Sequence, residues 1–269
     1  MNKKTIVWIL AVVITILAAY YQRKTGPTHP KKATVEISGE KYSFDLLRSG
    51  VTGRDAKIKI EIPNESISGT VTYRRYPTNE EWKTVEFKRE GGKLIAALPT
   101  QPQAGKLEYY LELHDGQHEV VVAKENPIKI RFRGDVPAWV LIPHIIIIFA
   151  AMLLSTVAGL FAYFKLPKYK MYGSIAFFTL LVGGMIFGPL VQQYAFSALW
   201  TGVPFGWDLT DNKTLIAVIF WTIAFFANRK KERPVWIIVA AIVLLVIFSI
   251  PHSMLGSELD YTSGDVIAA

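Results

Sequence analysis

The stretch WVLIPHIIIIFAAMLLSTVAGLFAYF, residues Trp139–Phe164, decides the class of this protein. It is longer than the roughly 20 helical residues that span the hydrocarbon core of a bilayer. Three more apolar runs come after it, at Met171–Tyr194, roughly Lys213–Ala227 and Val235–Ile250. The last two runs are short for a full span. The second half of the chain, residues 137–269, therefore predicts a block of four transmembrane helices.

Composition agrees with a protein that has two different parts. Hydrophobic residues make up 51% of the 269 residues, yet 19% of the residues are charged, so the two kinds must be segregated. Most charged residues lie in the first half of the chain. Cysteine is absent, which excludes disulfides, thiolate metal sites and thiol nucleophiles.

A further apolar run, Ile6–Tyr21, lies near the N-terminus after two lysines. It is either a secretory signal segment or an anchoring helix, and both would export the polar region on its C-terminal side. Cleavage after Ala19 would place Leu17 where a small residue is preferred, and the two tyrosines after Ala19 are typical of a membrane interface. We therefore predict a transmembrane anchor over residues 1–24, with a cleaved signal as the alternative.

Residues 25–136 show the alternation of β-strands. Ile58, Ile60 and Ile62 alternate with charged residues. The same pattern recurs in VTYRRY (71–76), KLEYYLEL (106–113), EVVVA (119–123) and IKIRF (128–132). Turn residues separate these runs, with no helical stretch between them, which predicts an antiparallel β-sandwich of immunoglobulin or fibronectin type.

Charge around the apolar runs predicts the topology. The loop after the first span contains Lys165, Lys168 and Lys170, and the loop after the third contains basic residues between 229 and 233. Both loops are therefore expected on the cytoplasmic side. The loop 193–212 and the C-terminal tail carry acidic residues instead. We predict a multi-pass protein of the bacterial inner membrane, with the β-sandwich and the C-terminus on the periplasmic side.

The net charge of +8 does not indicate nucleic-acid binding. The β-rich region is close to neutral, and the positive excess lies where the positive-inside rule places it. The expected partners are the lipid bilayer and an envelope protein that binds through the β-sandwich.

The tripeptide Ile-Pro-His occurs twice, ending at His144 and at His252. The predicted topology places both histidines near the outer membrane surface, together with a loop that contains Trp200, Phe205 and Trp207. Two imidazoles from two helices can ligate a haem without any cysteine. One hypothesis is therefore a single b-type haem with His144 and His252 as axial ligands and the three aromatic residues around it.

Three alternatives stay open for this outer layer. The same histidines with Asp208 and Asp211 offer imidazole and carboxylate ligands for a divalent metal. The β-sandwich and the outer loop together would also make a surface for a protein partner. In the plainest interpretation, the histidines and tryptophans are interfacial anchors, and Asp208 or Asp211 caps the next helix.

Other functional classes are disfavoured. The interiors of the four predicted helices, residues 145–164, 171–194, 215–227 and 235–250, contain no Asp, Glu, Arg, Lys or His, whereas proton-coupled transporters keep such a residue at mid-membrane. Ser155, Ser174 and Ser249 lie in apolar sequence without a nearby base, which disfavours a hydrolase. The protein is thus more an accessory or binding protein than an enzyme.

Two resemblances add to this interpretation. YRRYPTNEEWKTVEF (73–87) with LPTQPQAGKLEYYLELHDG (98–116) resembles the Ig-like accessory domains of bacterial envelope proteins. His144, together with GSELDYTSG (256–264), is similar to small bacterial four-helix membrane families of unknown function that are cytochrome-like. The matching positions are His144, Gly256, Leu259, Tyr261 and Gly264. PFGWDLTDNKT (204–214) likewise resembles a motif of hypothetical membrane proteins.

The second resemblance implies a membrane-embedded redox or haem-binding accessory protein. Four-helix b-type cytochromes with two haems use four histidines, and here only two lie at one face, so one haem at most is implied. The alternative is a non-enzymatic envelope assembly or anchoring protein whose β-sandwich binds a partner.

Overall fold

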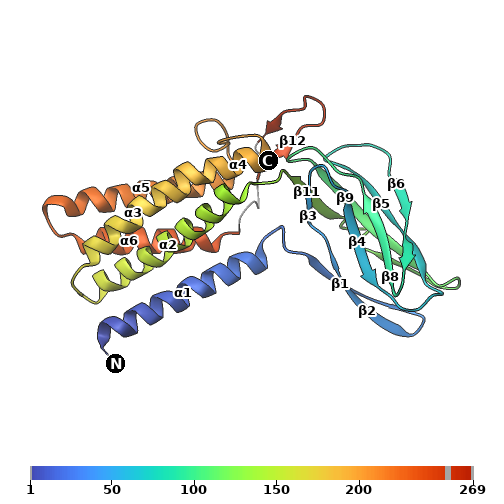
Figure 1. Ribbon diagram of the computed structural model, residues 1–269, viewed down its shortest axis with the longest axis horizontal. Helices are drawn as coiled ribbons and strands as arrows, with labels where there is room; N and C mark the ends of the chain where they lie inside the picture. The colour runs from blue at the N-terminus through green and yellow to red at the C-terminus, as the bar shows by residue number, and fades with distance from the viewer. Residues whose placement is uncertain (1, 252–255, 268–269) are drawn as a thin grey trace. The chain divides into compact units, whose positions relative to one another are not determined.

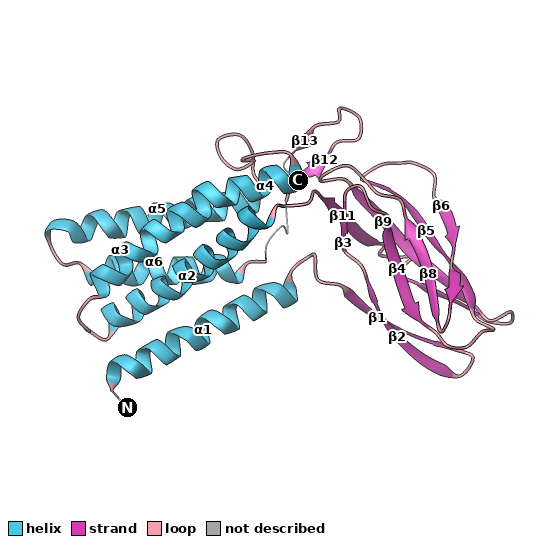
Figure 2. Cartoon of the chain, in the orientation of Figure 1, coloured by secondary structure: helices cyan, strands magenta, loops and turns pink. Residues whose placement is uncertain are grey.

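The computed structural model describes residues 2–251 and 256–267, and their contacts divide them into two units. Residues 2–26 and 136–251, with Gly256, form a helical unit. Residues 27–135 and 257–267 form a β unit. Figures 1 and 2 show the helices and strands of these units.

The helical unit contains mostly long apolar helices. They are α1 (Lys3–Thr25), α2 (Ala138–Tyr163), α3 (Tyr169–Leu180), the π-helical segment η1 (Leu181–Phe187), α4 (Gly188–Phe196), α5 (Leu209–Lys230) and α6 (Pro234–Ser249). The three segments α3, η1 and α4 run on as one helix. Within the described residues, α1, α2, this continuous helix and α5 are long and apolar enough to cross a membrane, and α6 is shorter.

Helix α5 is longer than its hydropathy predicts. The expectation of a short third helix near Lys213 is wrong, because α5 begins at Leu209 and has 22 residues. The Asp208 side chain accepts hydrogen bonds from two backbone N–H groups of the first turn and so caps the helix. The first turn is polar, and apolar character alone therefore misses it.

The π-helical segment η1 has a local cause in the sequence. Pro189 lies just after it and has no backbone N–H to donate, and its ring excludes a regular α-helical turn before it. The N–H of Gly188 instead reaches the Gly183 carbonyl oxygen, across the wider turn of a π-helix. The backbone of the continuous helix therefore departs from α-helical geometry at residues 181–187.

Small residues let the helices approach closely. A Cβ added at Gly159 of α2 would lie 2.6 Å from the Cβ of Ala241 on α6, so only glycine fits at this crossing. Trp221 of α5 is fully buried in the centre of the unit, where Phe177 and Leu244 belong to the same hydrophobic cluster. The core is thus formed between α2, α3, α5 and α6.

The two ends of the helical unit differ in charge. Trp8 of α1 and Tyr172 of α3 meet edge to face with ring centroids 5.6 Å apart, so the start of α1 lies beside the start of α3. We call this the basic end, because its segments carry Lys3, Lys4, Lys165, Lys168, Lys170, Arg229, Lys230, Lys231 and Arg233. At the opposite end, here called the loop end, Trp139 packs on Tyr194 with centroids 6.2 Å apart.

The β unit is built from short strands. They are β1 (Lys31–Ile37), β2 (Glu40–Leu46), β3 (Ser49–Val51), β4 (Ala56–Glu61), β5 (Ser68–Tyr76), β6 (Lys83–Glu86), β7 (Lys88–Glu90), β8 (Lys93–Leu98), β9 (Lys106–His114), β10 (Glu119–Val122), β11 (Ile128–Arg133), β12 (Glu258–Leu259) and β13 (Val266–Ile267). One sheet has the order β3-β11-β9-β5-β6, with β10 also pairing β9, and a second has the order β4-β8-β7. β1 pairs with β2, and β12 with β13.

The predicted strand pattern is confirmed where alternation was clear. β4, β5, β9, β10 and β11 coincide with the alternating segments of the sequence. In β4 the apolar residues are buried and the charged residues between them are exposed. The apolar residues of β4 share one hydrophobic core with residues of β9 and β11. Tyr109 of β9 is fully buried there and donates its hydroxyl to the Leu47 carbonyl oxygen at 2.9 Å. Burial raises the pKa of its phenol.

Candidate functional site

A buried carboxylate organises the loop between α4 and α5, at the loop end of the helical unit. The Oδ2 atom of Asp211 accepts the backbone N–H of Thr201 at 2.6 Å and that of Gly202 at 3.1 Å. The Thr201 hydroxyl lies 3.3 Å from the same oxygen. Hydrogen bonds to a charged acceptor are stronger than neutral ones, so Asp211 fastens this loop to the first turn of α5.

The neighbouring polar residues extend the same arrangement. Asp208 Oδ1 accepts the N–H groups of Thr210 at 2.7 Å and of Asp211 at 3.2 Å. Asn212 Oδ1 accepts the N–H of Val203 at 2.7 Å. One part of the plainest sequence interpretation, a cap on the next helix from Asp208 or Asp211, is thus confirmed for Asp208. The carboxylates of Asp208 and Asp211 thus each have one oxygen atom that accepts hydrogen bonds from two backbone N–H groups.

A glycine makes room for this contact. A Cβ at Gly202 would lie 2.6 Å from the Cβ of Asp211, so any other residue would push the loop away from α5. Glycine is therefore required for the close approach of the loop backbone to the carboxylate.

Lys213 is a buried cation that hydropathy did not reveal. Its side chain is 3% exposed, and Nζ donates to the Ile250 carbonyl oxygen at 2.8 Å and to that of Pro251 at 3.4 Å. The carbonyl groups at a helix C-terminus lack partners within the helix and carry partial negative charge. Lys213 therefore ties the start of α5 to the end of α6. The only sequence signal is one lysine at the edge of an apolar run.

His144 lies in α2 beside the irregular segment η1. Its Nδ1 atom is 3.0 Å from the Gly183 carbonyl oxygen, which also accepts the N–H of Gly188. A carbonyl oxygen only accepts hydrogen bonds, so Nδ1 carries the proton and Nε2 presents a lone pair. His252, the predicted second ligand, lies outside the described residues.

The three predicted aromatic residues do not behave alike. Trp200 is half-buried, and its indole N–H donates to the Val203 carbonyl oxygen at 3.1 Å. Phe205 and Trp207 are 82% and 79% exposed, so they do not line an enclosed pocket in this structure. No group of three or more His, Cys, Asp or Glu side chains that could hold a metal ion lies within residues 2–251 and 256–267.

The C-terminal tail makes a second organised site, in the β unit. The Tyr261 hydroxyl accepts the N–H of Lys106 at 3.0 Å and lies 2.9 Å from the carbonyl oxygen of the same residue. The guanidinium of Arg75 lies over the Tyr261 ring, 5.1 Å from its centroid. Burial raises the pKa of the Tyr261 phenol to about 12. A mostly buried ion pair between Glu258 and Lys106 lies beside it.

Space for this tyrosine depends on another glycine. A Cβ at Gly105 would come within 3.0 Å of the Tyr261 hydroxyl oxygen. The N–H of Leu259 also donates to the Ala104 carbonyl oxygen at 3.3 Å. Sequence reasoning singled out Tyr261 only through a resemblance, and nothing in its pattern predicted that the tail packs with the strands.

Comparison of the chain with protein-family models and with curated proteins finds no match. The functional interpretation therefore rests on the geometry of the two organised sites and of the surfaces around them.

We predict that Asp211→Ala loosens the loop between α4 and α5. The substitution leaves the amides of Thr201 and Gly202 without their acceptor, and bonds to a charged group contribute about 1.5–3 kcal/mol. Hydrogen exchange of these two amides should accelerate by about tenfold or more. Asp211→Asn keeps an acceptor oxygen and is the matched control. Unchanged exchange in Asp211→Ala would contradict this role.

We predict that alkaline pH releases the tail. The phenol of Tyr261 stays protonated in the docked tail up to pH about 12, whereas an undocked tyrosine ionises near pH 10. Docking is therefore at full strength below pH 10 and weakens as the pH rises towards 12. The difference between the alkaline absorbance titrations of the wild type and of Tyr261→Phe should show one phenol that ionises near pH 12. A difference titration centred near pH 10 would disprove the docked phenol.

Proposed function

We propose that this protein is a non-enzymatic component of the bacterial envelope. In this proposal the helical unit spans the inner membrane, and the β unit is an immunoglobulin-like sandwich that presents a partner-binding surface on the periplasmic side. The support comes from the apolar surface, from the charge at the helix ends, and from the exposed face of one sheet.

The outer surface of the helical unit supports membrane insertion. Large apolar side chains project outward from several helices, including Ile146 of α2, Phe178 of α3 and Ile242 of α6, each more than half exposed. A water-soluble unit rarely exposes apolar side chains over so many faces, whereas a lipid-facing surface requires them.

Charge at the helix ends supports the orientation. The lysines and arginines of the basic end correspond to the cytoplasmic loops of the positive-inside rule. The C-terminus of α1 and the N-terminus of α2, which belong to the opposite end, both continue directly into the β unit. The tail after α6 is part of that β unit as well. All three connections are consistent with a β unit on the periplasmic side.

Strand order supports the immunoglobulin-like sandwich. The sheets β4-β8-β7 and β3-β11-β9-β5-β6 match the two-sheet arrangement of such domains, and their apolar residues share one core. The pair β3 and β11 is parallel, while the other pairs are antiparallel. The hydroxyl of the buried Tyr109 in β9 donates a hydrogen bond to the carbonyl oxygen of Leu47 and so links β9 to the segment before β3.

One observation carries the partner-binding proposal, namely a row of aromatic and cationic side chains on the larger sheet. The Arg74 guanidinium lies 4.5 Å from the centroid of the Trp82 ring, which meets Tyr110 edge to face at 5.2 Å. The ammonium of Lys129 lies 3.6 Å from the centroid of Tyr76. We call these residues the aromatic face.

The aromatic face has the composition of an interface. Tryptophan, tyrosine and arginine dominate binding energy at protein interfaces, and here their rings are already held by neighbours. Trp82 remains 37% exposed, so a partner has apolar surface to cover. The buried charges Asp208, Asp211 and Lys213 of the helical unit, by contrast, are engaged by backbone groups.

We predict that Trp82→Ala abolishes capture of the envelope partner. Truncation of a central aromatic residue costs about 2 kcal/mol or more, which is roughly a thirtyfold loss of affinity. The full-length protein, purified in mild detergent from envelope extracts, should retain a stoichiometric protein that the variant loses. Lys59→Ala, on the other sheet, is the control. Equal recovery with wild type and Trp82→Ala would exclude the aromatic face as the binding surface.

A second candidate function, a haem-binding redox accessory protein, is favoured by His144. Its Nδ1–H bond to a backbone carbonyl leaves Nε2 as the ligating atom, which is the usual arrangement of metal-binding histidines. His144 from α2, together with His252, would hold the haem iron. A bound haem would supply one-electron chemistry.

For this candidate we predict a Soret band in the protein purified from haem-replete cells. The band should disappear in His144→Ala, because the ligating nitrogen is lost, and should persist in His118→Ala, whose histidine lies in the β unit. Visible absorbance of matched protein concentrations makes the comparison. A colourless wild-type protein rules out the haem.

A further inference from the structure

The outward-facing side chains of strand β11 are all basic. The three apolar residues of this strand are buried in the core of the β unit, and the residues between them are on the opposite face of the sheet. These outward residues are Lys129, Arg131 and Arg133, which we call the basic strip. Neighbours on one face of a strand are about 7 Å apart, so the strip is a row of regularly spaced cations.

Positive charge dominates this end of the larger sheet. Strand β11 lies beside β9 (Figure 1), and Arg131 is in register with Lys106 at the start of β9. The nearby carboxylate of Glu108 is bound by Arg74, and only 8% of the Glu108 side chain is exposed. Glu258 from the tail is likewise mostly buried and is paired with Lys106. Both ends of the basic strip are exposed, so this end of the sheet face presents cations rather than carboxylates.

The other end of the same sheet face is acidic. Its outward positions include Glu86 of β6, Glu112 of β9 and Glu119 of β10. Lys124 lies there as well and is paired with Glu112. The charge of the face thus changes sign along the strands, from positive at β11 and the start of β9 to negative at the end of β9.

Chain connections tether the positive end to the helical unit. Arg133 is five residues before Ala138, the first residue of α2, and a segment of that length spans at most about 18 Å. The tail that follows α6 docks at the same end of the sheet, where the Tyr261 hydroxyl accepts the N–H of Lys106. In the membrane orientation proposed above, on which this inference rests, the basic strip therefore lies within reach of the membrane surface.

The charge pattern selects the kind of surface that the strip meets. A neutral sugar would stack on an aromatic ring, but the Lys129 ammonium covers one face of Tyr76 at 3.6 Å from the ring centroid. A soluble polyanion that covered the whole sheet face would be repelled by its acidic end. A membrane meets only the end that is tethered beside it, and guanidinium groups bind phosphate with two parallel hydrogen bonds.

We propose that the basic strip binds the phosphate groups of anionic phospholipids. The β unit is then held against the membrane surface by its positive end, with the acidic end turned away. Basic residues close to a membrane-spanning helix are attracted to anionic lipids in this way. The contact leaves the proposed partner surface accessible, because β9 and β5 separate β11 from β6, and Trp82 directly precedes β6.

The reactivity of single lysines in lipid discs of defined composition tests the contact. The full-length protein is reconstituted in nanodiscs of phosphatidylcholine, with or without phosphatidylglycerol, and treated with a water-soluble acetylating reagent. Peptide mass spectrometry compares Lys129 with Lys59, an exposed lysine on the other sheet. Phosphatidylglycerol should slow the acetylation of Lys129 about fivefold and leave Lys59 unchanged, and high salt should remove the effect. Equal rates for Lys129 in both discs, or equal slowing of Lys59, overturn the proposal.

Removal of the two arginines provides the matched comparison, with Lys129 kept as the reporter. The double variant Arg131→Gln, Arg133→Gln should weaken the contact roughly 25-fold, so that Lys129 reacts at nearly the same rate in both discs. Lys57→Gln with Lys59→Gln removes two charges from β4 and should keep Lys129 protected. A Tyr261 phenol that still ionises near pH 12 shows that each variant is folded. Protection that persists in the arginine variant refutes the strip.

Further arms separate the lipid from a soluble anion and from the proposed partner. Inorganic phosphate that protects Lys129 in discs of phosphatidylcholine, as phosphatidylglycerol should, would overturn the lipid contact. Trp82→Ala should keep Lys129 protected, because Trp82 belongs to the partner surface. A protein that stays outside the discs overturns the membrane-spanning proposal and this inference with it, whereas an unprotected Lys129 in protein that enters the discs overturns the inference alone.

Discussion

Backbone groups that leave regular helix geometry within an apolar surrounding need a partner, and this constraint organises the loop end and η1. At each place where the backbone is irregular, one polar side chain forms hydrogen bonds with the backbone groups concerned. Asp211 accepts the loop amides of Thr201 and Gly202, Lys213 donates to the carbonyl groups at the end of α6, and His144 donates to the Gly183 carbonyl beside η1. These buried polar residues of the helical unit thus stabilise exceptions in the backbone. This common role explains why they do not converge on one another.

Apolar runs and two-residue alternation predicted where most helices and strands lie, because both depend on local sequence. Three features escaped that analysis for a physical reason. The first turn of α5 depends on a cap at Asp208, the irregularity of η1 depends on Pro189, and the burial of Lys213 depends on the distant end of α6. For the candidate site, the sequence named Asp208, Asp211 and His144, and the cap at Asp208 is confirmed, but it predicted neither the role of Lys213 nor the partners of these side chains. Pairings between segments far apart in the chain leave no periodic signal.

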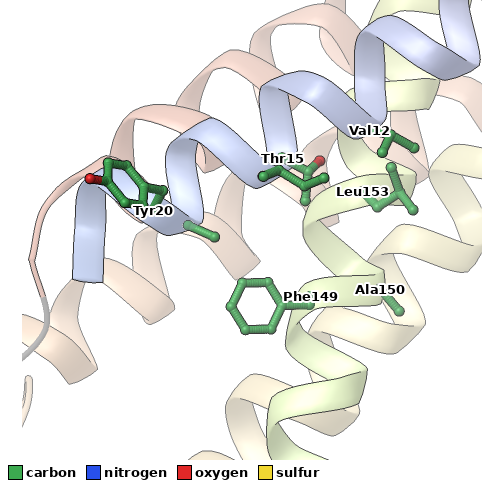
Figure 3. Close-up of a pocket in the computed structure, with 8 residues that line it drawn as sticks. Val12, Thr15, Tyr20, Phe149, Ala150 and Leu153 are labelled. Carbon is green, nitrogen blue, oxygen red and sulfur yellow. The ribbon is translucent and has the colours of Figure 1, made fainter. Parts of the chain in front are cut away.

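The surfaces of the helical and β units differ in kind. On the β unit, aromatic rings are fixed by cations and remain available to a partner, as with Trp82 and Arg74. The basic strip on β11 presents cations that suit the phosphates of a bilayer. On the helical unit, the surface is apolar, and an open groove lies between α1 and α2 (Figure 3). The haem hypothesis uses none of these surfaces and depends on the Nε2 atom of His144. Each proposal therefore stands on its own observation.

The docking of the tail also orders the biogenesis of the protein. Residues 257–267 are synthesised after every helix described here, yet they belong to the β unit, whose other strands are made before α2. The recess at Gly105 and Lys106 thus receives Tyr261 only once α6 has been translated. The β unit reaches its final form last, although most of it emerges first, so its completion reports that the whole helical unit has been made.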